Sequence, residues 1–206
     1  MKKVLLINGS PHQYGCTYTA LKEILDTLNK EQIEGEIIWI GNKPISGCIA
    51  CGACKTGKCV FDDEVNEILA KIDEYGAIIV GSPVYYAGPS GQLCSFLDRL
   101  FYSSKGRLAH KLGASVVSCR RGGASAAFDR LNKYFTISNM PIVSSSYWNQ
   151  VHGNTPSEVK QDLEGLQTMH NLAKNTAWLM KCIELGKENN IPLPSLERGN
   201  YTNFIR

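Results

Sequence analysis

Apolar residues along the chain form two alternating kinds of segment. Short uninterrupted apolar runs predict buried parallel strands, because a strand that helices cover on both faces has no polar side. Longer segments with apolar residues three and four positions apart predict amphipathic helices. The predicted strands are residues 3–7, 36–40, 77–81, 114–118 and the less apolar 141–144. The predicted helices are residues 17–29, 62–72, 92–102, 124–135 and 157–187, the last as one helix or two.

This alternation predicts an α/β fold with a doubly wound parallel sheet. Thr17 is expected to cap the first helix, and Asp62 or Asp63 the second. No repeat, low-complexity segment or long linker divides the sequence. Residues 1–190 are therefore expected to form one domain, and residues 191–206 an extended C-terminal tail.

Composition narrows the class of protein. Of 206 residues, 43% are apolar and 20% charged, as in an ordinary soluble globular domain, and the net charge of +3 gives no basic footprint for nucleic acid. The apolar run Val4–Ile7 is too short for a signal-peptide core, and no stretch has the length of a membrane span. We therefore expect a cytoplasmic protein without nucleic-acid or membrane partners. Its eight cysteines then indicate metal ligands, reactive thiols or small core residues rather than disulfides.

The loop after the first strand has the chemistry of an anion site. It runs from Asn8 to Thr17 and leads into a helix, whose first N–H groups attract negative charge. Gly15 lets the backbone approach a phosphate, and Ser10 and Thr17 offer hydroxyl groups. The loop has no lysine and matches neither the P-loop nor the dinucleotide fingerprint, so a monophosphate suits it best. The alternative is an ordinary strand-to-helix turn.

These residues resemble a known family. Gly9-Ser10-Pro11 followed by Gly15-x-Thr17 resembles the phosphate loop of NAD(P)H-dependent FMN reductases and related iron–sulfur flavoproteins. The similarity continues at residues 81–86, at Tyr147-Trp148 and at residues 202–206, so it covers nearly the whole chain. The family often has asparagine where this chain has Cys16. The resemblance implies a flavodoxin-like fold with five parallel strands in the order 2-1-3-4-5, and FMN across the carboxyl ends of strands one, three and four.

The resemblance also implies which residues contact FMN. The phosphate is expected to lie against Ser10, His12, Gly15, Cys16 and Thr17; the alternatives are a plain surface histidine for His12 and a small packing residue for Cys16. The ring edge is expected to lie against Pro83, Val84, Tyr85, Tyr86, Ala87 and Gly88. The pyrimidine side is expected to lie against Cys119, Arg120, Arg121, Gly122 and Gly123.

The pyrimidine-side residues and the ring-edge tyrosines each have a predicted chemical role and an alternative. The N–H groups of Gly122 and Gly123 are expected to stabilise negative charge near flavin N1 and O2, as an oxyanion hole does. Arg120 or Arg121 would add to this or contact the phosphate of NADPH; otherwise both are solvated surface arginines. The two tyrosines of the ring-edge loop present flat apolar surface to the ring, or simply pack under the loop.

A cluster of four cysteines is the densest chemical signal. Cys48, Cys51, Cys54 and Cys59 lie within twelve residues, and clustered thiolates suit soft metals. The spacing resembles the motif that holds a four-iron cluster near FMN in the iron–sulfur flavoproteins. Zinc is a second possibility, although its sites more often show two separated pairs. A loop of free thiols is the third.

Together these features predict an FMN-dependent oxidoreductase without a catalytic acid or base side chain. Hydride would pass from NADH or NADPH to flavin N5, and electrons onward to a quinone, a nitroaromatic compound, free flavin or a redox protein. The alternatives are a non-enzymatic electron carrier between proteins and a flavin-free regulatory domain. A homodimer or higher homo-oligomer is expected, with the apolar tail 192–206 packed over a neighbouring subunit.

Overall fold

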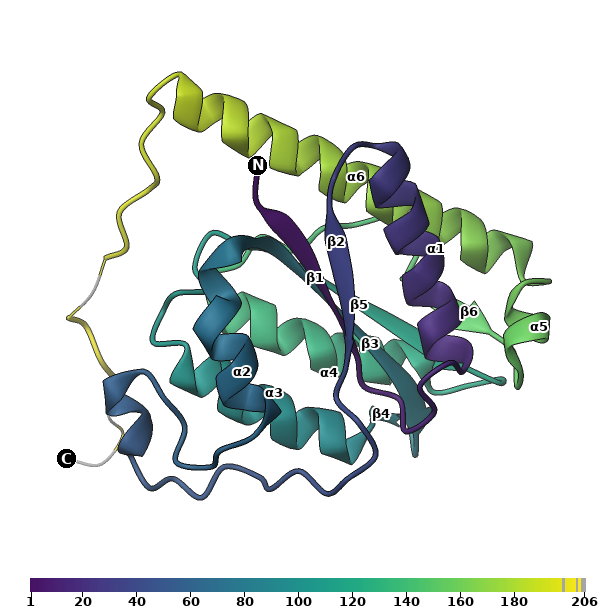
Figure 1. Ribbon diagram of the computed structural model, residues 1–206, viewed down its shortest axis with the longest axis horizontal. Helices are drawn as coiled ribbons and strands as arrows, with labels where there is room; N and C mark the ends of the chain where they lie inside the picture. The colour runs from purple at the N-terminus through teal and green to yellow at the C-terminus, as the bar shows by residue number, and fades with distance from the viewer. Residues whose placement is uncertain (198, 203, 205–206) are drawn as a thin grey trace.

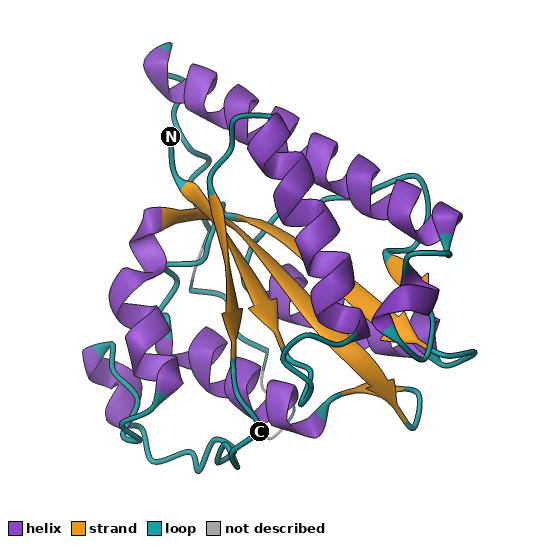
Figure 2. Cartoon of the chain, turned by 45° about the vertical axis from the view of Figure 1, so that its right-hand side comes forward, coloured by secondary structure: helices purple, strands orange, loops and turns teal. Residues whose placement is uncertain are grey.

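The computed structural model describes residues 1–197, 199–202 and 204, and it places one twisted sheet between two layers of helices (Figures 1 and 2). The strands are β1 (Lys3–Asn8), β2 (Gly35–Trp39), β3 (Tyr75–Tyr85), β4 (Gly88–Pro89), β5 (Leu112–Cys119) and β6 (Gln150–His152). The parallel strands follow the order β2-β1-β3-β5-β6, and the short β4 pairs antiparallel with β3. This flavodoxin-like order confirms the predicted sheet.

The helices cover both faces of this sheet (Figure 1). They are α1 (Cys16–Lys30), α2 (Glu64–Lys71), α3 (Gly91–Ser103), α4 (Ala124–Ile137), α5 (Pro156–Val159) and α6 (Leu163–Glu188), with short 3₁₀ turns η1 (Ala53–Thr56) and η2 (Ile72–Glu74). On one face, Leu5 and Ile7 of β1 pack with α2, α3 and α4. On the other, Val4 and Leu6 pack with α1 and α6. β1, β3 and β5 contribute residues to both clusters, so both of their faces are buried and their sequences show no regular polar alternation.

The fifth parallel strand is not where the sequence placed it. The prediction of a strand at residues 141–144 is wrong, because this segment makes a single bridge, between Gly113 and Ile142. The chain then leaves the sheet, and asparagines of α6 hydrogen-bond Ser144 and Ser146. It returns at Asn149, whose side-chain Nδ2 donates to the Ser115 carbonyl at 3.0 Å. Pairing resumes only at β6, which begins eight residues downstream of the single bridge.

The helix caps also differ in part from the sequence prediction. Gly15, without a capping side chain, precedes α1, so the predicted Thr17 cap is wrong. Asp63, not Asp62, caps α2, and its Oδ1 accepts from the Val65 amide at 3.2 Å. The long C-terminal helical segment is divided into α5 and α6.

The described residues after α6, 189–197, 199–202 and 204, contain neither helix nor strand. Tyr201 and Phe204 in this tail are almost fully exposed. Asn203, Ile205 and Arg206 of the closing motif lie outside the described residues. None of the described helices combines the length and hydrophobicity needed to cross a lipid bilayer.

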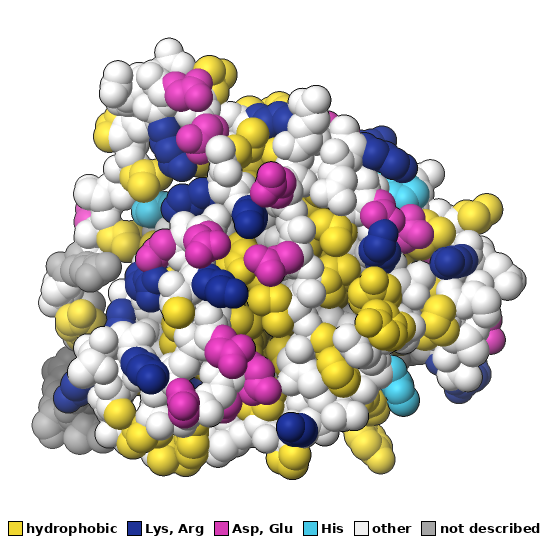
Figure 3. Space-filling model, viewed as in Figure 1, with side chains coloured by type: hydrophobic (Ala, Val, Ile, Leu, Met, Phe, Trp, Pro, Cys, Tyr) yellow, Lys and Arg dark blue, Asp and Glu magenta, His cyan; other side chains and the backbone are white. Residues whose placement is uncertain are grey.

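Acidic and basic side chains are interspersed over the face shown in Figure 3. That distribution agrees with the small formal net charge of the sequence. On this face the molecule shows no extended patch of one sign, of the kind that steers a protein to a polyanion.

Lys111 is a buried cation at the amino end of the sheet. Its Nζ donates to the Tyr75 carbonyl at 2.6 Å, and only 7% of the residue is exposed. Burial and the nearby positive charge of Lys2 lower the pKa of Lys111 to about 8. The unfolded chain therefore binds more protons than the folded chain between pH 8 and the ordinary lysine pKa near 10.4, so this group favours folding increasingly as pH rises.

We expect this titration to appear as a difference between the native chain and Lys111→Met. From pH 7.5 to 9.5, the free energy of unfolding of the native chain should rise relative to that of Lys111→Met by roughly 1–3 kcal/mol. Urea unfolding at several pH values measures it. Buried thiols titrate in the same pH range and change the free energy of unfolding in the opposite direction. Their contribution is common to both proteins, so it cancels when the free energy of Lys111→Met is subtracted from that of the native chain. A pH-independent difference would show that Lys111 keeps an ordinary pKa.

Candidate functional site

A pocket of about 360 Å³ lies where β1, β3, β5 and β6 end. Open α/β sheets bind their ligands at this carboxyl edge. The lining residues are Ser10, His12, Gly15, Cys16, Thr17, Pro83, Val84, Tyr85, Ser118, Cys119, Arg120, Gly153, Asn154, Thr155 and Pro156. The pocket thus joins residues of all three predicted flavin-contact groups, and we refer to it as the carboxyl-edge pocket.

The loop between β1 and α1 is held by its own side chains. Asn8 Oδ1 accepts from the Ser10 amide, and Asn8 Nδ2 donates to the Gln13 carbonyl. The Ser10 hydroxyl accepts from the His12 amide at 3.1 Å, and Trp39 Nε1 donates to the Ser10 carbonyl at 2.7 Å. A loop fixed in this way loses little entropy on binding, which favours a preformed anion site.

The amino end of α1 faces the pocket with free donors. Gly15 provides no capping side chain, so the first-turn N–H groups of α1 are available to a ligand anion. A Cβ on Gly15 would lie 3.0 Å from His12 Cβ, so a larger residue would crowd the loop. The Cys16 thiol donates to the Gly153 carbonyl at 3.7 Å, and burial raises its pKa. Cys16 is therefore a neutral thiol that ties α1 to the loop after β6.

Thr17 joins α1 to the sheet. Its hydroxyl lies 2.8 Å from the Ser118 hydroxyl, and the residue is 1% exposed. The sequence offered this hydroxyl as a free donor to phosphate, whereas the structure pairs it with β5. The backbone N–H of Thr17 stays in the first turn, where it adds to the anion-binding end of the helix.

The predicted ring-edge loop is a β-hairpin. Val84 pairs with Pro89 and Tyr85 with Gly88, and the two turn residues Tyr86 and Ala87 have φ of 48° and 59°. A two-residue turn with both φ positive matches the twist of the paired strands, although non-glycine residues rarely adopt it.

The hairpin divides the predicted ring contacts into two groups. Pro83, Val84 and Tyr85 line the pocket, whereas Tyr86, Ala87 and Gly88 form the tip outside it. Tyr85 is 47% exposed and Tyr86 is fully exposed. The alternative prediction, in which both tyrosines pack under the loop, is therefore wrong.

The end of β5 presents a thiol and an arginine. Cys119 is buried, its Sγ lies 3.4 Å from His152 Nδ1, and burial raises the pKa of its thiol. Arg120 lines the pocket and is exposed, whereas Arg121 and Gly122 are exposed outside it. Gly123 precedes α4 with a φ of 85° and lies against the hairpin tip, where an added Cβ would come within 2.9 Å of Ala87 Cα.

Five lining residues were missed from the sequence: Ser118, Gly153, Asn154, Thr155 and Pro156. Four of them follow β6, so the misplaced fifth strand hid their position at the carboxyl edge. The sequence signal was the Gly-Asn-Thr-Pro run, which has the composition of a turn at the end of an element.

The four clustered cysteines line a second, smaller pocket. Cys48 and Cys51 are exposed, Cys54 is buried, and Cys59 is half-buried. All four border one apolar pocket of about 20 Å³, together with Phe61, Arg99 and Tyr102 among others. No three His, Cys, Asp or Glu side chains among residues 1–197, 199–202 and 204 are placed as a ready metal-ligand group. The fold thus gathers the four thiols at one pocket.

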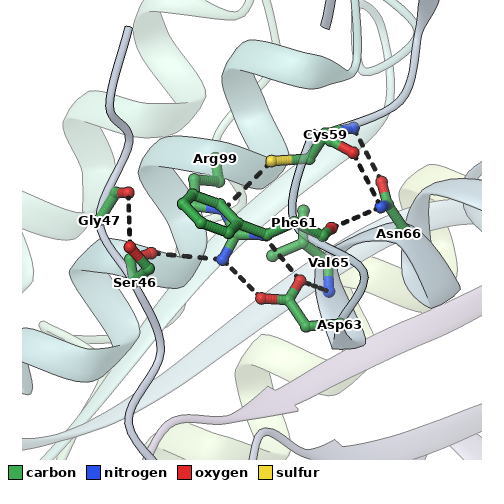
Figure 4. A network of polar contacts seen from close by, with 8 residues as sticks. All are labelled: Ser46, Gly47, Cys59, Phe61, Asp63, Val65, Asn66 and Arg99. Carbon is green, nitrogen blue, oxygen red and sulfur yellow. Dashed lines mark hydrogen bonds and ion pairs between the residues drawn. The ribbon is translucent and has the colours of Figure 1, made fainter. Parts of the chain in front are cut away.

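Arg99 of α3 fastens the cysteine loop to the core (Figure 4). Its guanidinium makes two 2.7 Å contacts with the Asp63 carboxylate and donates to the Ser46 carbonyl at 3.3 Å. Its Nε donates to Cys59 Sγ at 3.3 Å, and its Cζ lies 4.7 Å from the centre of the Phe61 ring. One side chain therefore holds both ends of the cysteine segment.

The charge of Arg99 survives its burial. Only 1% of the side chain is exposed, and burial alone would lower the pKa of the guanidinium, but hydrogen bonds with Asp63 and Cys59 outweigh it and the net shift is upward. The sequence reading missed Arg99, since its neighbours predicted only an amphipathic helix. Its partner Asp63 lies 36 positions upstream, which no local pattern reveals.

The sheet order and the carboxyl-edge pocket define a flavodoxin-like α/β protein. A family model described as NADPH-dependent FMN reductase matches residues 2–155. The chain belongs to this family, which makes it a flavoprotein of the oxidoreductase class.

Similar curated proteins carry a more specific name. An iron-sulfur flavoprotein of Methanocaldococcus jannaschii is 37% identical over 88% of this chain and 99% of its own length. An iron-sulfur flavoprotein of Methanosarcina thermophila is 28% identical over 90% of this chain and 99% of its own length.

Solved structures with lower sequence identity share the fold. RosB, with a bound 8-demethyl-8-formylriboflavin-5'-phosphate intermediate, superposes with a TM-score of 0.71 at 14% identity, over 100% of this chain and 94% of RosB. A flavodoxin from the domain Archaea superposes with a TM-score of 0.59 at 16% identity, over 88% of this chain and 99% of that protein. These two matches support the flavodoxin-like fold.

Proposed function

We propose that this chain binds FMN in the carboxyl-edge pocket and moves electrons from NADH or NADPH to a small acceptor or a redox protein. The observation that carries the proposal is this single pocket, which joins a helix end with free N–H donors to the edge of the β3–β4 hairpin. An anion and an adjoining flat ring are the two parts of FMN. Bound FMN would supply the redox chemistry, accepting hydride at N5.

The residues of the pocket fit the two parts. The first turn of α1, together with Ser10 and His12, would hold the phosphate, and the brace from Asn8 keeps that loop in shape. Pro83, Val84 and Tyr85 offer apolar surface to the ring. The positive charge of Arg120 at the pocket wall would favour negative charge on the ligand or attract a nicotinamide phosphate.

The cysteine pocket fits a second redox group by the chemistry of its donors. Cys48, Cys51, Cys54 and Cys59 supply four thiols, the ligand set of a four-iron cluster. The names of the curated relatives support iron over zinc. We include such a cluster in the proposal, with these four residues as its ligands.

An electron carrier between proteins is the second candidate function. The exposure of Cys48 and Cys51 favours it, because a cluster held there would lie near the surface, within reach of a protein partner. The two candidates differ in their electron donor: a nicotinamide for the reductase, and a reduced protein for the carrier. A homo-oligomeric assembly and a cytoplasmic setting remain part of the proposal.

One spectroscopic experiment tests the proposal. Anaerobically purified protein is expected to show flavin absorption bands together with a broad iron–sulfur shoulder. Addition of NADPH or NADH should bleach the flavin bands within seconds. Bleaching by reduced ferredoxin or dithionite, without any response to either nicotinamide, would favour the carrier. A colourless protein that takes up no FMN would refute both candidates.

A further inference from the structure

The hydrogen bond from Arg99 Nε to Cys59 Sγ is the starting observation. The donor–sulfur distance is 3.3 Å, and the arginine is almost fully buried. A neutral thiol is a weak acceptor, whereas a thiolate is a strong one for a charged donor. A buried guanidinium aimed at sulfur is therefore an arrangement that benefits a metal-bound thiolate far more than a free thiol.

The two terminal nitrogens of the Arg99 guanidinium hydrogen-bond other residues. Its two terminal nitrogens hold Asp63 in a bidentate pair and reach the Ser46 carbonyl, and the Phe61 ring covers its face (Figure 4). Asp63 is itself fixed, because its Oδ1 caps α2. These contacts leave Arg99 little freedom, so the direction of its Nε–H toward Cys59 is set by the scaffold.

We propose that Arg99 is a positioning residue for the metal centre, holding Cys59 in place as a ligand and stabilising the negative charge on its sulfur. This inference rests on the proposed function, since it requires a cluster in the cysteine pocket. Hydrogen bonds to ligand sulfurs and nearby positive charge stabilise the reduced, more negative form of an iron–sulfur cluster. Arg99 would thereby raise the reduction potential of the cluster and slow its loss.

The test uses the double variant Arg99→Met/Asp63→Asn. Removing both partners leaves no unpaired buried charge, and asparagine still caps α2, so the fold is expected to persist. The cluster midpoint potential, followed by electron paramagnetic resonance during an anaerobic redox titration, should shift to more negative values. The half-life of the cluster in air should fall several-fold, while bound FMN stays the same.

A matched control is available in the same protein. Arg107 and Asp73 form another arginine–aspartate pair, at 2.6 Å, and neither residue hydrogen-bonds any of the four clustered cysteines, all of which lie in the described part of the chain. Arg107→Met/Asp73→Asn should leave the midpoint potential and the cluster half-life unchanged. A third variant, Arg99→Lys, keeps the charge but cannot reproduce the planar set of contacts.

The outcomes separate this inference from the proposed function. Native protein with FMN but without iron refutes the cluster and, with it, the role of Arg99. Native protein with a cluster whose potential and half-life are the same in Arg99→Met/Asp63→Asn refutes the role of Arg99 alone. An Arg99→Lys variant identical to the native protein would also overturn the proposal, because charge without the directed Nε–H would then suffice.

Discussion

Replacing Cys54 with serine is expected to abolish iron binding and leave FMN binding intact. Cys54 is the buried member of the four clustered cysteines and borders the same pocket as the other three. Serine is nearly the same size, but its hydroxyl stays protonated near neutral pH and does not replace a thiolate as an iron ligand. Iron and acid-labile sulfide per chain should fall to background, with one FMN retained, in anaerobically purified protein.

Cys182→Ser is the matched control for this substitution. Cys182 is an exposed cysteine of α6, outside the cysteine loop, so its loss should leave the iron content unchanged. Metal analysis of the native protein separates the three interpretations of the loop. Iron with sulfide supports the cluster, zinc in its place supports a zinc site, and the absence of both metals supports a loop of free thiols. Stoichiometric iron in Cys54→Ser would contradict the ligand assignment.

The Gly123→Val substitution is expected to weaken FMN binding about 10- to 100-fold, which corresponds to roughly 1.4–3 kcal/mol. Gly123 has a φ of 85°, which costs a β-branched residue about 1–3 kcal/mol. An added Cβ would also lie 2.9 Å from Ala87 Cα and 3.1 Å from Val84 Cγ1, so the hairpin must move. Because Val84 lines the carboxyl-edge pocket, the displacement reaches the proposed ring site.

Gly122→Val is the neighbouring control. A Cβ at Gly122 meets no atom within 4 Å, and its φ is not in the left-handed region. Fluorescence titration of apoprotein with FMN gives both dissociation constants, and thermal melting checks that each variant is folded. Equal losses in the two variants would show that the close packing of Gly123 on the hairpin is irrelevant to the flavin.

Much of the fold could be predicted from local patterns. β1 is buried on both faces, so its uninterrupted apolar run Val4–Ile7 was unambiguous. The fifth strand could not be placed by pattern, because the chain pairs with β5 at Ile142, leaves the sheet, and pairs with β5 again only at β6. The apolar 141–143 segment bridges the sheet at one point, and the shorter β6 is held by the non-local hydrogen bond from Asn149 to β5.

The candidate sites show the same division between local and non-local information. The phosphate loop and the cysteine loop are each contiguous in sequence, so their chemistry was visible there. Arg99 and the Thr17–Ser118 pair depend on contacts between residues 36 and 101 positions apart, respectively. The hairpin turn at Tyr86-Ala87 escaped notice because its positive φ values occur at residues that rarely adopt them.

The excursion between the Gly113–Ile142 bridge and β6 links the edge of the sheet to α6. The sheet edge is secured at both sides of the excursion, by that bridge and by the pairing of Val117 with Gln150. Between these two contacts, Asn171 and Asn175 of α6 donate to the Ser146 hydroxyl and the Ser144 carbonyl, so α6 and not the sheet positions this segment. Since Gly153–Pro156 follow β6 directly and wall the carboxyl-edge pocket, α6 and the edge strand together support that wall of the pocket.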